Sequence, residues 1–78
     1  MPTVLQLGPY RFFFYSDDFA EPPHIHVQRE RFKAKFWLNP VRIQQSGGFS
    51  RSELSRIQKL VEEHEELFLQ RWDEYFTA

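Results

Sequence analysis

Cysteine is absent from the 78-residue sequence. Its absence excludes disulfide bonds and thiolate metal sites, and it fits a protein of the reducing cytoplasm. The sequence also lacks an apolar run of about 20 residues, which a membrane-spanning helix would need. Its first residues, MPTVLQLGPYR, have neither the basic segment nor the apolar core of a signal peptide. We therefore expect a soluble cytoplasmic protein that does not interact with membranes.

The chain is also short, and we expect it to form a single domain over residues 1–78. A domain of this size buries only about 60% of its unfolded surface and has little stability to spare. Aromatic residues are abundant, with nine Phe, three Tyr and two Trp, and ten of the fourteen lie before residue 50. Aromatic side chains bury much area per residue, so they suit either a compact core or a partner interface.

A strong net charge is missing as well. The formal charge is −1, and it is divided unevenly along the chain. Residues 1–49 carry six Lys or Arg against four Asp or Glu, and residues 50–78 carry four against seven. The balance of +2 in the first part is far below the basic excess of most nucleic-acid-binding domains.

The first part of the sequence predicts an α+β fold that begins with a small antiparallel sheet of about five short strands over residues 3–46. The strand pattern is apolar or alternating, and Gly8-Pro9, Asn39-Pro40 and Gly47-Gly48 punctuate it. We place the strands at 3–7, 10–16, 24–28, 32–38 and 41–44. A two-residue turn at Glu30-Arg31 would pair the third strand with the fourth.

This hairpin fixes which side chains share a face, because successive side chains on a strand point in opposite directions. Ile25 then lies opposite Phe36, and Val27 lies opposite Ala34, so that both apolar sets agree. The other face carries two histidines, two lysines and a tryptophan, namely His24, His26, Lys33, Lys35 and Trp37. We expect the two histidine rings to lie outside the core.

The second part predicts a long helix over about residues 50–76. Ser50 is a good N-cap, and Glu53 stands where it can reach back to complete a capping box. Apolar residues follow at helical spacing. Such a helix would be about 40 Å long, which exceeds the span of a small sheet. Either the helix breaks near 62–66, or its second half, with Phe68, Trp72 and Tyr75, packs on another chain.

Several motifs together, "RFFFYS", "EPPHIHV", "AKFWL" and "GFSRSELSRIQKLVEEH", resemble a small bacterial family catalogued as domain of unknown function 4160. The resemblance covers essentially the whole chain. It implies a gene that often stands beside that of a second small domain, in an arrangement similar to a toxin–antitoxin pair. It implies no established catalytic residues.

The two histidines of EPPHIHV are the main candidates for chemistry. On a strand, His24 and His26 point to one face and could chelate one metal ion, with a third ligand from Asp17, Asp18 or Glu21. Two histidines are only half of a site, however. We therefore expect neither a metal nor another cofactor, with both rings packed beside Trp37 and Lys35.

Three hypotheses about function remain. The first is a non-enzymatic interaction module that binds a companion small protein or a second copy of itself, through residues 61–76 and the edge strands. The second is a nuclease-type toxin in which His24, His26 or Lys35 would be catalytic. The third is a sheet-based RNA binder that uses Trp37, Lys33, Lys35 and Arg29. The aromatic surplus favours the first, with Phe68, Trp72 and Tyr75 as contact residues.

Overall fold

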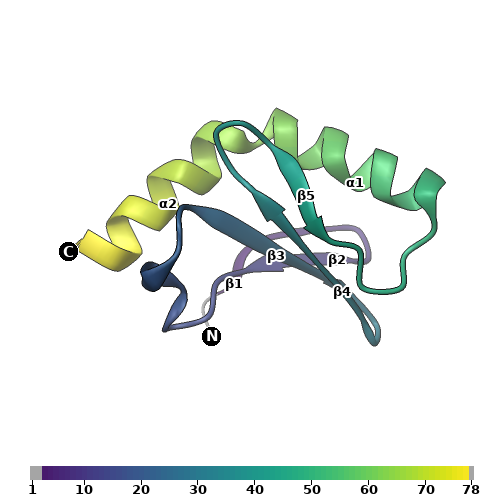
Figure 1. Cartoon of the computed structure of the whole chain (residues 1–78), viewed down its shortest axis with the longest axis horizontal. Coiled ribbons are helices and arrows are strands. Elements are labelled where there is room, and N and C mark those ends of the chain that lie inside the picture. Colours follow the sequence, from purple (N-terminus) through teal and green to yellow (C-terminus); the bar gives the residue numbers. More distant parts are fainter. Residues whose placement is uncertain (1–2, 78) are drawn as a thin grey trace.

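A computed structural model describes residues 3–77 of the chain. Its elements are β1 (Thr3–Leu7), β2 (Tyr10–Phe13), the 3-10 helix η1 (Asp18–Ala20), β3 (His24–Arg29), β4 (Phe32–Trp37), β5 (Arg42–Gln45), α1 (Arg51–Glu63) and α2 (Glu65–Thr77). The strands form one antiparallel sheet in the order β1-β2-β3-β4-β5 (Figure 1). This confirms the predicted α+β fold, although β2 ends at Phe13 rather than near residue 16.

The β3–β4 hairpin has the predicted register. Ile25 pairs with Phe36, Val27 with Ala34, and His24 with Trp37. The turn needs a left-handed residue, and Glu30 supplies it with a φ of 54°. The alternation therefore assigned the two faces of this hairpin correctly.

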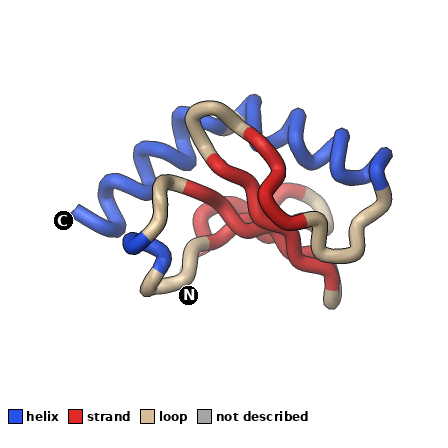
Figure 2. The backbone as a smooth tube through the Cα atoms, in the orientation of Figure 1, coloured by secondary structure: helices blue, strands red, loops and turns tan. Residues whose placement is uncertain are grey.

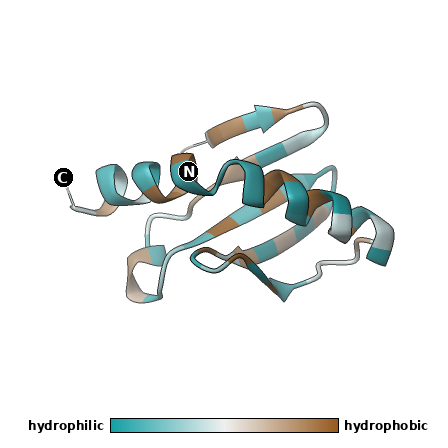
Figure 3. Ribbon diagram, turned by 90° about the horizontal axis from the view of Figure 1, so that it is seen from above, coloured by the Kyte–Doolittle hydropathy of each residue, from teal (hydrophilic) through white to brown (hydrophobic). Residues whose placement is uncertain are grey.

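The two helices cover only one face of the sheet, as Figures 1 and 2 show. Seen from above in Figure 3, they run in line across the strands. The core between the layers contains Tyr10, Phe12, Phe14, Ile25, Val27, Ala34, Phe36, Leu38, Val41, Phe49, Ile57, Val61, Phe68 and Trp72. None of the helices in the described range 3–77 is both long and apolar enough to cross a membrane.

The predicted break in the helix occurs at His64, which has a φ of −113° and separates α1 from α2. The Nδ1 atom of His64 lies 2.8 Å from the carbonyl oxygen of Leu60, four residues earlier. A side chain that occupies this carbonyl competes with the main-chain ladder and bends the helix. The bend lets both helices follow the sheet.

Packing of α2 on its own sheet corrects one expectation. Phe68 is fully buried and Trp72 is 7% exposed, so both belong to the core rather than to a partner interface. Phe68 lies 5.3 Å from Phe12 between ring centroids, and Trp72 lies 5.3 Å from Phe14. Tyr75, by contrast, is 42% exposed. Of the two alternatives that the sequence left open, the break is the one that occurs, and it directs α2 back onto the sheet.

The start of α1 also differs in one detail from the prediction. Ser50 caps the helix as expected, since its hydroxyl accepts a hydrogen bond from the Glu53 amide at 3.2 Å. The Glu53 carboxylate, however, does not complete a capping box. It accepts two hydrogen bonds from Arg29, at 2.7 and 2.9 Å, and one from the Tyr10 hydroxyl at 2.7 Å. The pairing ties α1 to β2 and β3.

This pairing makes the stability depend on pH. The hydrogen bonds from Arg29, and then that from Tyr10, hold the pKa of Glu53 below its ordinary value. A carboxyl with a lowered folded-state pKa stabilises the fold above its unfolded pKa, and this stability is lost as pH falls through the folded pKa. We expect Glu53→Gln to be less stable than wild type at pH 7, with the difference closing in acid below about pH 4.3.

Urea unfolding of both proteins at pH 7 and at a series of acidic pH values measures this difference. Glu74→Gln is the control, because it breaks an exposed ion pair with Arg71, and such pairs contribute little. A constant difference between wild type and Glu53→Gln across the pH range would contradict the assignment.

Candidate functional site

The histidines of EPPHIHV meet an aspartate from the preceding loop. Asp18, His24 and His26 each bring one ligand-type atom into a group whose members all lie within 4.8 Å of one another. The Nε2 atom of His24 is 3.1 Å from Oδ1 of Asp18, and the Nε2 atom of His26 is 3.1 Å from Oδ2. We call these three residues the Asp-His-His cluster.

The double proline explains how His24 is oriented. Each proline ring fixes its own φ, and Pro23 also restricts Pro22. The carbonyl oxygen of Pro22 lies 2.9 Å from Nδ1 of His24, and that of Pro23 accepts a hydrogen bond from the Leu38 amide at 3.0 Å. A carbonyl can only accept, so the proton of a neutral His24 ring is on Nδ1 and Nε2 is left with its lone pair.

The other two members of the cluster are also held in place. Oδ2 of Asp18 accepts a hydrogen bond from the Tyr15 amide at 2.8 Å. The His26 ring stacks on Phe13 at 5.4 Å and meets the edge of Tyr15 at 4.6 Å. Burial lowers the pKa of His26, and the Asp18 carboxylate beside it offsets part of that effect. The hydrogen bond from the Tyr15 amide therefore fixes the Asp18 carboxylate, and the aromatic contacts fix the His26 ring.

The expectation that both histidine rings lie outside the core is wrong for His24. Its side chain is fully buried, and that of His26 is 14% exposed. The His24 ring lies 5.7 Å from Trp37 and 5.1 Å from Trp72. The loop with η1 packs against His24 at the start of β3. The alternation of side chains along a strand cannot show that a loop buries one of them.

The upstream carboxylates have different positions. Asp18 is 9% exposed and belongs to the cluster, whereas Asp17 is exposed and lies outside it. Glu21 is at the rim, where its Oε1 atom is 3.8 Å from Nε2 of His24 and 2.5 Å from Nζ of Lys35. The sequence indicated these three carboxylates as candidates for a third metal ligand, and only the structure shows which of them lies beside both histidines.

The predicted basic and aromatic face forms only in part. Lys33 is exposed, and its Nζ lies 3.3 Å from the Tyr15 hydroxyl. Lys35 pairs with Glu21 and lies over the Trp37 ring at 4.9 Å. Arg29 does not extend this face, because it points to the helix side and binds Glu53. Alternation along β3 places Arg29 on the same face as Ile25 and Val27. The expectation that Arg29 would bind RNA together with Lys33 and Lys35 is therefore wrong.

A second feature combines Tyr75, which the sequence named as a contact residue, with Phe19, which was not predicted. Phe19 is 67% exposed, and its ring lies 6.4 Å from that of Phe76, which in turn contacts Tyr75 at 4.7 Å. We call Phe19, Tyr75 and Phe76 the C-terminal aromatic surface. The surface joins η1, which carries Phe19, to the C-terminal end of α2, which carries Tyr75 and Phe76, and these two segments lie near each other in Figure 1. An isolated phenylalanine among the loop residues DDFAEPP was the available signal.

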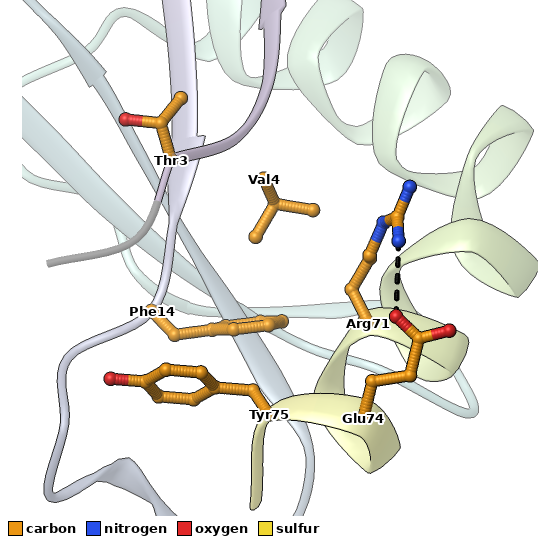
Figure 4. Close-up of a pocket in the computed structure, with 6 residues that line it drawn as sticks. All are labelled: Thr3, Val4, Phe14, Arg71, Glu74 and Tyr75. Atoms are coloured by element: carbon orange, nitrogen blue, oxygen red, sulfur yellow. Dashed lines mark hydrogen bonds and ion pairs between the residues drawn. The ribbon is translucent and has the colours of Figure 1, made fainter.

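A groove of about 280 Å³ adjoins this surface (Figure 4). It is lined by Thr3, Val4, Phe14, Arg71, Glu74 and Tyr75. The rings of Phe14 and Tyr75 lie along one side, and the Arg71–Glu74 ion pair stands on the other. The groove therefore combines an apolar wall with a charged rim, and β1 forms its far side.

Fold and sites together define a small α+β protein with a five-stranded antiparallel meander, two helices on one face, a buried Asp-His-His cluster and an exposed aromatic surface. The chain belongs to the family described as Domain of unknown function (DUF4160), whose model matches residues 10–73. This confirms the resemblance noted in the sequence. The chain matches no curated protein and no solved structure.

Proposed function

We propose that the protein is a non-enzymatic interaction module that binds a companion small protein, as one member of a toxin–antitoxin-like gene pair. The observation that carries the proposal is the C-terminal aromatic surface with its adjoining groove. Phe19 and Tyr75 are two of only three large apolar side chains that are exposed within residues 3–77. The third, Ile43, lies on the edge strand β5.

Exposed aromatic side chains at one place favour a protein partner. Single exposed apolar residues are ordinary on any surface, but a group of aromatics beside a groove is the usual setting of interface hot spots. Phe19 and Tyr75 would supply contact area, and a partner side chain would enter the groove beside Phe14. Arg71 and Glu74 would form the polar rim.

The sheet edge beside the groove supports the same proposal. β1 is an edge strand, so one side of its backbone is not paired within the sheet. Thr3 and Val4 of this strand also line the groove. An extended partner segment could add to β1 by main-chain hydrogen bonds while its side chains occupy the groove.

The alternative functions receive less support. A nuclease needs a general acid or base that reaches its substrate, and His24 is fully buried. An RNA-binding face needs free cations, and Lys35 is already paired with Glu21. Lys33 is an exposed cation on that face, as is Arg42 opposite Trp37, and Lys33 serves to discriminate the RNA-binding hypothesis from ours.

The test is the affinity for the protein encoded by the neighbouring gene, measured by titration calorimetry. Hot-spot residues cost about 2 kcal/mol or more when truncated, which corresponds to about 30-fold in affinity. We expect Phe19→Ala and Tyr75→Ala each to weaken binding by about this factor. Lys33→Ala on the opposite face should leave binding unchanged.

Two results would contradict the proposal: no binding to the neighbour's product, or loss of binding in Lys33→Ala with retention in both aromatic variants.

A homodimer through the same surface is the second arrangement that we propose. Light scattering over a range of concentrations measures it, and Tyr75→Ala should then shift the protein to the monomer.

A further inference from the structure

We propose that the Asp-His-His cluster is a zinc site, with Nε2 of His24, Nε2 of His26 and a carboxylate oxygen of Asp18 as ligands. The site borders the proposed docking surface, because Asp18 and Phe19 are neighbours in η1, but metal binding there does not depend on a companion protein. Two imidazoles and one carboxylate are a common ligand set for zinc and related transition metals. Mg²⁺ and Ca²⁺ prefer sites rich in oxygen, and this cluster is dominated by nitrogen.

The strongest observation concerns Nε2 of His24. This atom is buried and makes no hydrogen bond with any residue in the range 3–77. Oδ1 of Asp18 is 3.1 Å away, but the contact does not have the geometry of a hydrogen bond. When Nδ1 of a neutral ring donates to Pro22, the buried Nε2 presents a lone pair toward a carboxylate, which is also an acceptor. A cation between them would satisfy both atoms.

The distances also fit. Ligands bound at about 2.0–2.1 Å around a tetrahedral zinc ion lie about 3.3–3.4 Å from one another. Nε2 of His24 is 3.1 Å from Oδ1 of Asp18, and Nε2 of His26 is 3.1 Å from Oδ2, so the two histidines lie near different oxygens of one carboxylate. The remaining separation, between the two histidines, is at most 4.8 Å. A modest rotation of one imidazole ring would shorten the distance between the two histidine nitrogens to that range.

The surroundings match those of metal ligands in general. A ligating histidine typically donates its other ring nitrogen to a carbonyl or carboxylate, which fixes the ring, and the Pro22 carbonyl does this for His24. The Tyr15 amide fixes Asp18 in the same way. Oε1 of Glu21, 3.8 Å from Nε2 of His24, is placed to become a fourth ligand if it exchanges its bond with Lys35.

The ion would have a structural role. It would join the loop with η1 to β3, and the energy of metal binding would add to folding stability. A small domain without disulfide bonds gains most from such a link. The EPPHIH motif then has one explanation: the prolines orient the first histidine, and strand alternation places the second beside it.

The test uses the full chain freed of metal with a chelator and then dialysed. Zinc chloride should bind with one ion per chain in calorimetry and raise the temperature of unfolding, whereas magnesium chloride should change neither. In nitrogen spectra of the wild-type imidazoles, zinc should shift the resonances of His24 and His26. The resonances of His64, the remaining histidine, should stay in place.

His26→Gln and Asp18→Asn should each lose at least about 100-fold in zinc affinity, since changes one shell further out already cost 10–100-fold. His64→Gln is the matched control and should bind zinc like wild type. Absence of zinc binding in wild type would overturn the proposal and leave the cluster as a buried ion pair. Unchanged imidazole resonances of His24 and His26, or wild-type affinity in both ligand variants, would also overturn it.

Discussion

Phe68→Ala should lower the free energy of unfolding by about 3–5 kcal/mol, as is typical when a buried aromatic ring is truncated. Phe68 is fully buried, and its ring lies over Phe12 of the sheet. Stability scales with length at roughly 0.05–0.15 kcal/mol per residue, or about 4–12 kcal/mol for 78 residues, so this loss removes a large part of the total. We expect the variant to be largely unfolded at 37 °C.

Phe19→Ala is the matched control, because it makes the same chemical change at a side chain that is 67% exposed. Urea unfolding followed by circular dichroism should give it nearly the stability of wild type. Equal stability of Phe68→Ala and Phe19→Ala would contradict the packing of α2. It would return Phe68 to the partner interface that the sequence first indicated.

His24→Ala should cost about 2–5 kcal/mol when it is measured in the presence of a chelator, so that no metal contributes. The ring is fully buried between Trp37 and Trp72, and its removal leaves a cavity. The variant also removes a partner of the buried Asp18 carboxylate, and unsatisfied buried polar groups are costly.

His26→Ala provides the comparison, because the two histidines differ mainly in position. The His26 side chain keeps some exposure, at 14%, although it packs on the buried Phe13 and on Tyr15. We expect less than half of the loss seen for His24→Ala. Similar losses in thermal and urea unfolding would show that the burial of His24 has been assigned incorrectly.

The β3–β4 hairpin was predictable because a strand has a period of two residues. Only one register places Ile25 against Phe36 and Val27 against Ala34, and a slip by one residue would turn both apolar sets outward. The cap at Ser50 and a break near residues 62–66 were also predictable, since both depend on local sequence. The order of the five strands could not be predicted from the sequence, and the structure supplies it.

The contacts that define the sites depend on residues far apart in sequence, and local patterns do not encode them. Glu53 pairs with Arg29 across 24 residues instead of with its neighbouring cap. Phe19 and Phe76 meet although 57 positions separate them. The burial of His24 required knowing that the loop with η1 covers the end of β3. Burial of a side chain by a segment distant in the sequence is a tertiary property, and the alternation of residues along a strand does not predict it.

Amide hydrogen exchange of the chain, with and without the product of the neighbouring gene, tests the proposed function most directly. We predict slower exchange on binding in three places: β1, the loop that contains Phe19, and the last turns of α2 around Tyr75. The β3–β4 hairpin that carries Lys33 should exchange at the same rate in both states. Protection confined to that hairpin, or no protection at all, would contradict the proposal that this protein acts through its C-terminal aromatic surface.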